Sequence, residues 1–286
     1  MAAQLVALPP VERLSPRVIR ILGGNPGKFT LQGTNTYLVG TGRQRILIDT
    51  GEGRPAWIAS LQETLVQENA TVGSALLSHW HYDHVNGIKD LLSLSPATKL
   101  YKHTPDANQS AIEDGQVFEA EGVTLRAAHT PGHTTDHIAF VLEEEDAMFT
   151  ADNVLGQGTA VFEDMSSYLK SLGRMREMFR GRAYPGHGPV VEDGPGKIAE
   201  YIAHRRAREE QVLRTIGTRD NNNNSGGLKS WTPLDIVKVV YADVREELHE
   251  AAARGVLQIL EKLETEGVVQ RDGEQRWRLR ADSPSL

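Results

Sequence analysis

Cysteine is absent from the 286 residues of the chain, which excludes disulfide bonds, thiolate nucleophiles and thiolate metal ligands together. Any metal ion must therefore be held by nitrogen and oxygen atoms. Long hydrophobic runs are absent too, since none approaches the roughly 18 residues that a membrane-spanning helix needs. The N-terminus lacks the basic and then apolar layout of a secretory signal. These absences predict a cytoplasmic protein that makes no membrane contact.

Positive charge is in short supply. The formal net charge is −7, with 31 lysines and arginines against 38 aspartates and glutamates. This balance disfavours an extended nucleic-acid surface, although it leaves room for a local basic patch. Hydrophobic residues make up 39% of the chain and charged residues 24%, which is ordinary for a globular protein with a proper core. The length suits one large domain, or a large domain with a small one.

Strand and helix patterns are interspersed over the first 217 residues, with hairpin-like spacing between several strands. This pattern predicts an α/β sandwich of mixed sheets rather than a strict βαβ repeat. The expected strands are Val18–Leu22, Thr36–Val39, Arg45–Ile48, Ala75–Leu77, Lys99–Lys102, Val123–Ala128, Ile138–Leu142, Ala147–Thr150 and a short one near Arg182–Tyr184. The expected helices are Pro55–Glu68, Met165–Phe179 and Ile198–Thr215.

A polar, low-complexity segment interrupts the chain at Arg219–Gly227. The sequence therefore predicts a large domain over 1–217, a linker over 218–230 and a small module over 231–286. In the module, Thr232 suits an N-cap and Pro233 the first helical position. A second helix is expected over Glu246–Glu266, and Asp272 with the following glycine predicts a hairpin turn. Two helices and a hairpin give a winged-helix-like outline.

The charge of the small module weighs on its use. Residues 231–286 contain 8 lysines and arginines against 11 aspartates and glutamates. A duplex-binding module would be expected to be basic. We therefore expect the module to cover the active site or to mediate an oligomer contact, and not to bind duplex DNA.

The chemically informative segment is Ser78-His79-Trp80-His81-Tyr82-Asp83-His84, directly after a buried strand. Three imidazoles and a carboxylate within six residues cannot all pack as neutral core groups. A tight loop would let these side chains converge on one centre, and imidazole with carboxylate suits zinc, manganese or iron. The competing interpretation is a solvated, histidine-rich loop.

This H-x-H-x-D-H pattern resembles the metallo-β-lactamase superfamily. Asp49-Thr50-Gly51 precedes it, and Thr130-Pro131-Gly132-His133, Asp152 and Pro185-Gly186-His187-Gly188 follow it. The resemblance implies an αββα sandwich that binds two metal ions, zinc or else manganese or iron. The implied ligands are His79, His81 and His133 for the first ion and Asp83, His84 and His187 for the second, with Asp152 bridging both. The family often has Gly-Asp at the bridge where this chain has Ala151-Asp152, a change from which we expect little consequence.

The implied pair of ions has a chemical purpose. Two ions roughly 3.5–4 Å apart share a hydroxide at neutral pH, because metal binding lowers the pKa of water to near 7. Asp83 and Asp152 would offset charge and orient that nucleophile, so they are the expected catalytic residues. Asp49 either supports the ligand loop or simply forms a turn. Asn35 either donates to an oxyanion or has a structural role.

Three of the five histidines outside the implied ligand set could also serve a site. His129 and His137 flank the implied ligand His133, and we expect neither to bind metal. His204 neighbours Arg205, Arg206 and Arg208, but Glu209 and Glu210 follow at once. A solvated helix face is therefore favoured there over a site for an anionic substrate.

The substrate class stays open between two groups that the chain resembles within the lactamase-β-2-like and glyoxalase-II-like branch. Fungal polyketide-cluster thioesterases release a polyketide from an acyl carrier protein, whereas a mitochondrial lactamase-β-2-like endoribonuclease cuts single-stranded RNA. A thiol leaving group, with a pKa near 8.5, needs little general acid, and the acidic chain would repel RNA. A carrier-protein thioesterase is therefore favoured. The alternatives are the nuclease, a small-molecule thioester or lactone hydrolase, and a metal-free scaffold.

Overall fold

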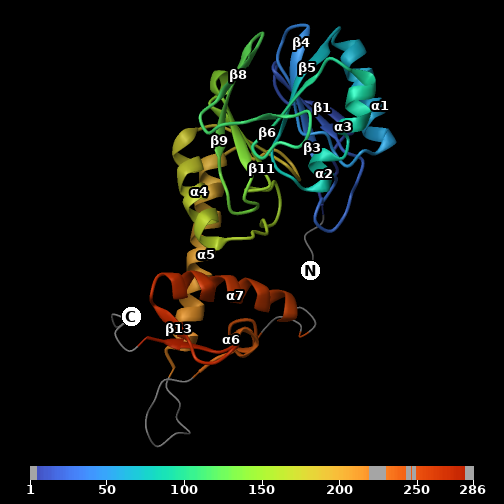
Figure 1. Ribbon diagram of the computed structural model, residues 1–286. Coiled ribbons are helices and arrows are strands. Elements are labelled where there is room, and N and C mark those ends of the chain that lie inside the picture. The colour runs from blue at the N-terminus through green and yellow to red at the C-terminus, as the bar shows by residue number, and fades with distance from the viewer. Residues whose placement is uncertain (1–4, 219–229, 243–245, 247–248, 281–286) are drawn as a thin grey trace, which may run out of the picture. The chain divides into compact units, whose positions relative to one another are not determined.

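The computed structural model describes residues 5–218, 230–242, 246 and 249–280 (Figure 1). The chain divides into two compact units, Met1–Tyr201 and Ile202–Leu286, and the division falls inside helix α5 (Gly194–Ile216). The boundary expected after residue 217 lies just beyond the end of that helix, 16 residues after the division between the units, and stays a prediction. The polar segment 219–227 lies outside the described residues. None of the helices that the structure describes is long and apolar enough to cross a membrane.

Two β-sheets form the centre of the first unit. The seven-stranded sheet follows chain order and consists of β1 (Val11–Arg13), β2 (Val18–Leu22), β3 (Asn35–Val39), β4 (Gln44–Ile48), β5 (Thr71–Leu77), β6 (Lys99–Lys102) and β7 (Ser110–Ala111). The five-stranded sheet has the order β12 (Ala183–Pro185), β11 (Ala147–Ala151), β10 (Ile138–Leu142), β9 (Val123–His129) and β8 (Val117–Ala120). Strands β4 to β7 run parallel to one another, as do β11 and β12, and the remaining pairs in the two sheets are antiparallel.

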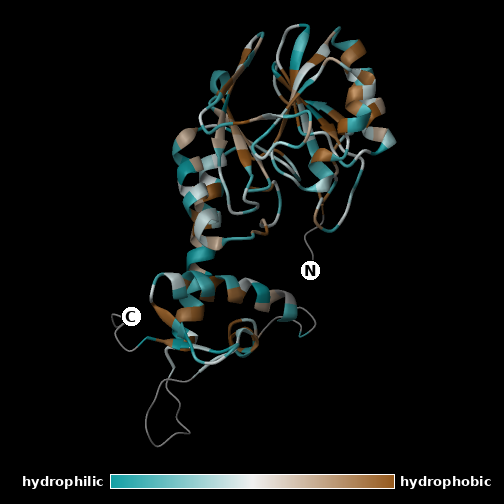
Figure 2. Ribbon diagram, viewed as in Figure 1, coloured by the Kyte–Doolittle hydropathy of each residue, from teal (hydrophilic) through white to brown (hydrophobic). Residues whose placement is uncertain are grey.

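Successive side chains along each strand point to opposite faces of the sheet, and this alternation separates the layers. In β4, Ile46 and Ile48 pack between the sheets with residues such as Phe140, whereas Leu47 faces the other way, onto Trp57 of helix α1 (Pro55–Gln67). Helix α3 (Ile88–Leu94) covers the same outer face, and α4 (Met165–Met178) and the start of α5, as far as Tyr201, cover the outer face of the second sheet (Figure 1). Hydrophobic residues lie along the strands of both sheets (Figure 2). The expected αββα sandwich is confirmed.

The second unit contains the expected module. Thr232 caps helix α6 (Pro233–Val240) through a reciprocal pair of hydrogen bonds with Asp235. Helix α7 (His249–Thr265) and the hairpin of β13 (Val269–Arg271) and β14 (Trp277–Leu279) complete it. Two helices followed by a hairpin give the predicted winged-helix order.

Most expected elements agree with the structure within a few residues, but one expectation about the histidine segment was wrong. The segment is a loop only as far as His81, because Asp83 and His84 lie on the four-residue helix α2 (Tyr82–Val85). Sequence analysis also missed β1, β7, β8 and α3. These elements have between two and seven residues, too few for a period of two or 3.6 to emerge.

Candidate metal centre

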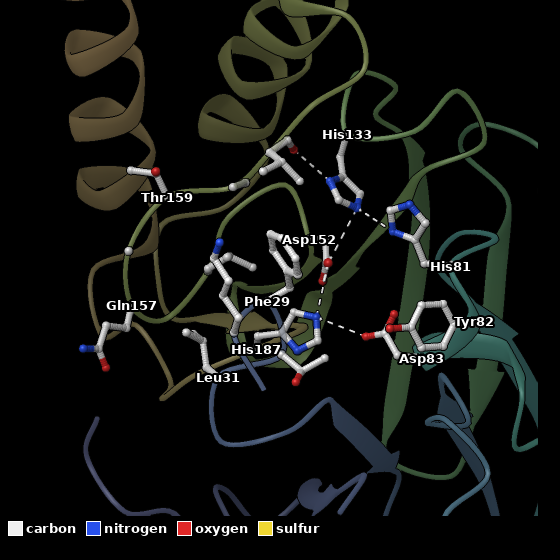
Figure 3. A pocket seen from close by; sticks show the side chains of 16 residues that line it. Phe29, Leu31, His81, Tyr82, Asp83, His133, Asp152, Gln157, Thr159 and His187 are labelled. Carbon is white, nitrogen blue, oxygen red and sulfur yellow. Dashed lines mark hydrogen bonds and ion pairs between the residues drawn. The ribbon is translucent and has the colours of Figure 1, made fainter. Parts of the chain in front are cut away.

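Seven side chains from five different segments meet at one edge of the two sheets (Figure 3). Each segment follows the carboxyl end of a strand. His79 and His81 come after β5, Asp83 and His84 lie on α2, His133 comes after β9, Asp152 comes after β11, and His187 comes after β12. The structure therefore brings together every residue that the sequence nominated as a ligand.

The first group gathers three imidazoles around a common point. His81 Nδ1 lies 2.9 Å from His79 Nε2 and 3.1 Å from His133 Nε2. Two nitrogen ligands of a tetrahedral zinc ion, each about 2.0–2.1 Å from it, would lie roughly 3.3 Å apart. Three ring nitrogens facing one another at such distances match the ligand side of a metal site.

The second group consists of two histidines and a carboxylate. Asp83 Oδ2 lies 3.3 Å from both His84 Nε2 and His187 Nε2. The hydroxyl of Thr34 donates to the same Asp83 oxygen at 2.9 Å, and this hydrogen bond fixes the orientation of the carboxylate. Thr34 was not among the residues nominated from the sequence, although it directly precedes Asn35, which was.

Asp152 lies between the two groups. Its Oδ2 is 3.5 Å from His133 Nε2 in the first group and 3.3 Å from His187 Nε2 in the second. Its Oδ1 is 3.4 Å from His84 Nε2. One carboxylate thus faces ligand atoms of both groups, which is the position that a bridging ligand requires.

Asp49 orients two of the histidines. The Nδ1–H of His84 donates to Asp49 Oδ2 at 2.7 Å. Ser78 Oγ donates to the same oxygen at 2.8 Å and in turn accepts from His79 Nδ1 at 2.9 Å. With both Nδ1 atoms acting as donors, the lone pairs of both Nε2 atoms point into the centre. Asp49 therefore supports the ligands, and its φ of 59° shows that it also forms the turn.

Buried atoms without partners indicate that a cation fits here. Within the described residues, His84 Nε2 and Asp152 Oδ1 are buried and have no hydrogen-bond partner. Such orphaned atoms are costly unless something else satisfies them. Both accept an electron-poor partner, and the nitrogen and oxygen donor set suits zinc, manganese or iron.

The electrostatics of the centre point the same way. Burial lowers the pKa of His79 well below its usual value and that of His81 to about 4, so both rings are neutral near pH 7. At His187 burial is opposed by the Asp152 carboxylate, which raises the pKa to about 9. Buried carboxylates therefore attract positive charge to the second group, and a metal ion supplies it in place of protons.

The other nominated residues have structural contacts. The side-chain amide of Asn35 donates to the carbonyls of Pro185 and Gly188, at 2.8 and 2.9 Å. Asn35 therefore holds the segment that carries His187, and its amide does not donate to an oxyanion. His137 is buried outside both ligand groups, with Nδ1 2.9 Å from Thr130 Oγ1.

His129 and His204, which were also considered from the sequence, do not belong to the ligand groups. His129 stacks on His103 with ring centroids 4.0 Å apart. His204 lies exposed on α5 and is absent from the lining of the cavity at the metal centre.

A cavity of about 450 Å³ opens onto the candidate metal centre (Figure 3). Five of the ligand residues form its floor: His81, Asp83, His133, Asp152 and His187. Its walls come from two loops, and the apolar residues among them are Phe29, Leu31, Leu155, Ala160 and Val161. Lys28 is the single lysine or arginine among the described residues that line it. The cavity thus joins a polar floor to apolar walls.

Relatives of known sequence match the chain over most of its length. It is 47% identical over 258 residues to the atrochrysone carboxyl ACP thioesterase of Aspergillus chevalieri, covering 90% of this chain and 83% of the relative. It is 46% identical to the lactamase-like protein ptaB of Pestalotiopsis fici, covering 96% and 90%. A further atrochrysone carboxyl ACP thioesterase, from Aspergillus novofumigatus, is 45% identical over 93% of this chain and 84% of the relative.

Solved structures share the fold. A metallo-beta-lactamase family protein from Thermus thermophilus superposes with a TM-score of 0.73 at 23% identity, covering 94% of this chain and all of that one. A beta-lactamase domain protein from Burkholderia ambifaria has a TM-score of 0.79 at 19% identity, covering 98% and 96%. The model of the beta-lactamase associated winged helix domain matches residues 232–277. The model of the metallo-beta-lactamase superfamily matches residues 29–109 and 100–187, and the chain belongs to that superfamily.

Proposed function

We propose that the protein is a zinc-dependent thioesterase that hydrolyses an acyl group from the thiol arm of an acyl carrier protein, the acyl group being a polyketide. The observation that carries the proposal is the cavity: apolar side chains such as Phe29 and Val161 line its walls, and five of the seven candidate ligands line its floor. An acyl chain buries apolar surface against such walls while its thioester carbonyl reaches the polar floor.

The charge of the cavity favours an acyl substrate over RNA. Lys28 is the one lysine or arginine that the described residues contribute to its lining, and the chain as a whole carries a net charge of −7. RNA binding depends on several cations placed along the phosphate backbone. The apolar residues Leu31 and Leu155 line this cavity, and no such set of cations accompanies them among the described lining residues.

The thiol leaving group of a thioester suits a site that has no separate proton donor. Hydrolysis joins a water oxygen to the acyl carbon and breaks the carbon–sulfur bond, and the sulfur leaves as a thiolate. Because a thiol has a pKa near 8.5, the thiolate leaves at neutral pH without a proton donor. The cavity floor offers carboxylates and histidines already committed to the centre, so a substrate that needs no separate acid matches it.

Two bound ions would supply a hydroxide nucleophile at neutral pH and polarise the thioester carbonyl. The chain's own residues hold and orient what binds there. Asp152 faces both ligand groups, and Asp83 accepts a hydrogen bond from Thr34, so the two carboxylates would offset the charge of bound metal and accept hydrogen bonds from an attacking water. Asp49, through His84 and Ser78, keeps the ligand nitrogens aimed inward.

The comparisons support the same substrate class. Two of the relatives described above are named atrochrysone carboxyl ACP thioesterases, and the chain covers more than four fifths of each. We include in the proposal the cytoplasmic location expected from the sequence. We also include the division of labour expected there, with catalysis in residues 1–217 and an accessory role for residues 231–286.

The test compares two substrates on one preparation. Metal-replete protein is assayed on polyketide-loaded acyl carrier protein and on single-stranded RNA, with Asp152→Asn as the matched variant. We expect release of the free acid from the carrier protein, its loss in the variant, and no RNA cleavage. RNA cleavage that disappears in Asp83→Ala, without thioester hydrolysis, would replace the proposal with a nuclease.

A further inference from the structure

The wall of the cavity formed by residues 155–161 is anchored at both ends and bridged in between. At its start, Gly156 N donates to the carbonyl of His187 at 2.9 Å, and a Cβ on Gly156 would lie 2.0 Å from the carbonyl oxygen of Pro189. Beyond its end, Glu163 N donates to the carbonyl of Gly132 at 2.7 Å. The span between these anchors carries most of the residues that line this side of the cavity.

One buried side chain ties this span to helix α5. The Tyr201 hydroxyl accepts from the amide of Leu155 at 3.2 Å and donates to the carbonyl of Gly158 at 2.8 Å. The Tyr201 side chain is 3% exposed, so water competes poorly for these two bonds. A single hydroxyl therefore closes the loop on itself and fixes it to the helix.

The same loop contacts the metal centre. The carbonyl of Val161 accepts from His133 Nδ1 at 2.8 Å, which leaves His133 Nε2 directed at Asp152. The loop thus serves as one wall of the cavity and as the acceptor that orients a ligand. Figure 3 shows Gln157 and Thr159 of this wall lying away from His81, on the other side of the cavity.

We propose that Tyr201 is a positioning residue for the acyl-binding wall: its hydroxyl holds residues 155–161 in the conformation that receives the acyl group. The inference rests on the proposed thioesterase function for the nature of the ligand. The hydroxyl does not touch the reacting atoms. Removing it therefore affects how a large acyl group binds more than how the carbon–sulfur bond breaks.

The experiment replaces Tyr201 by Phe, which keeps the ring and removes only the hydroxyl. Amide hydrogen exchange is measured across residues 155–161 in the metal-loaded full-length protein. The Leu155 amide loses its acceptor, and exchange there should rise about tenfold, the equivalent of one hydrogen bond. The matched control is Tyr184→Phe, which removes a buried hydroxyl bonded to Glu145 and should leave exchange in the loop unchanged.

Hydrolysis supplies the second readout. In Tyr201→Phe, KM for an aromatic acyl thioester should rise about tenfold, while kcat for the acetyl thioester of the same thiol stays within about twofold. Gly158→Ala tests the loop at the residue whose carbonyl accepts from Tyr201. The added Cβ meets nothing within 4 Å, but the φ of 76° is unfavourable for alanine. The loop conformation should therefore be strained, and KM should rise although Tyr201 is intact.

Either of two results overturns the inference. Unchanged exchange at residues 155–161 in Tyr201→Phe would show that the hydroxyl does not hold the loop. Faster exchange in Tyr201→Phe, with KM changed by the same factor for large and small acyl groups, would show that the loop is not the acyl wall. A wild-type protein that hydrolyses no thioester would instead refute the proposed function, and the exchange measurement would still decide whether Tyr201 holds the loop.

Discussion

Asp49 and His84 lie 35 positions apart and share a buried hydrogen bond of 2.7 Å between Oδ2 and Nδ1. This bond fixes the ring so that Nε2 faces Asp83 and Asp152. Carboxylates that orient a ligand histidine commonly affect metal binding and activity as much as some ligands do.

The first prediction is that Asp49→Asn lowers metal affinity or activity by about 10–100-fold. The amide removes a negative charge and turns one of the two oxygen acceptors into a donor. Since Oδ2 accepts from His84 and from Ser78 Oγ while Oδ1 accepts from Ser78 N at 2.7 Å, an amide cannot keep all three bonds. Metal titration and kcat measure the effect. The control, Asp106→Asn, changes a carboxylate whose side chain is 73% exposed and should leave both values unchanged. Equal behaviour of the two variants would show that Asp49 merely forms a turn.

The histidine segment was predictable from its own chemistry, whereas the rest of the ligand set was implied by the resemblance to the metallo-β-lactamase superfamily. His79 to His84 stand out together, His133 and His187 occur in short motifs with glycine and proline, and Asp152 follows a strand. The role of Asp49 was not decidable, because a turn-forming aspartate and an orienting one leave the same sequence. The structure shows that this residue does both.

What sequence reasoning missed is contact between distant segments. The hydroxyl of Tyr201 donates to the carbonyl of Gly158, 43 residues earlier in the chain. Because every residue has a backbone carbonyl, the sequence does not indicate which one accepts this hydrogen bond. Helix α2 was missed because four residues are too short for periodicity to appear. Asn35 was recognised as close to the centre, but only the fold reveals that its amide serves the backbone on both sides of His187.

A second prediction concerns Ala151, where the family often has glycine. Its φ is 42°, in the left-handed region that costs an alanine about 1–2 kcal/mol. Ala151→Gly relieves this strain and adds about 0.4–1 kcal/mol of unfolded-chain entropy, so a gain in stability of up to about 1 kcal/mol is expected.

Urea denaturation of the metal-loaded protein measures the effect at Ala151. Ala139→Gly in β10, a position with no positive φ, should instead lose at least about 0.5 kcal/mol. A clear loss of stability in Ala151→Gly would mean that the methyl group, buried at 5% exposure, contributes more through packing than the backbone loses through strain.

A third prediction concerns acid stability. Hydrogen bonds from Arg13 and Arg45, the first being the stronger influence, hold the pKa of Glu68 below its ordinary value of 4.5. A lowered folded-state pKa contributes stability that is present above about pH 4.5 and is lost as the pH falls through the folded value.

Glu68→Gln should therefore destabilise the protein at pH 7 and progressively less below pH 4.5. Unfolding by urea at a series of pH values gives the difference between the two proteins. A difference that stays constant between pH 7 and pH 3 would mean that the Glu68 charge does not contribute.

A fourth prediction places Asp152 between two ions. Asp152→Asn removes the carboxylate whose Oδ2 lies 3.3 Å from His187 and 3.5 Å from His133. Loss of a shared ligand should reduce bound metal below two equivalents and lower kcat by at least about 100-fold, or about 2.7 kcal/mol of transition-state stabilisation. Elemental analysis and initial rates check both. Retention of two equivalents with full activity would remove Asp152 from the ligand set.

The most direct measurement of the whole account is a metal titration of the stripped protein. Metal is removed with a chelator, zinc is returned in steps, and hydrolysis of a carrier-protein thioester is followed at each step. Because the seven ligand residues, Asp152 among them, form two groups, the account predicts no hydrolysis without metal and a plateau at two equivalents per chain. Hydrolysis by the stripped protein, or a rate that never responds to added metal, would contradict it.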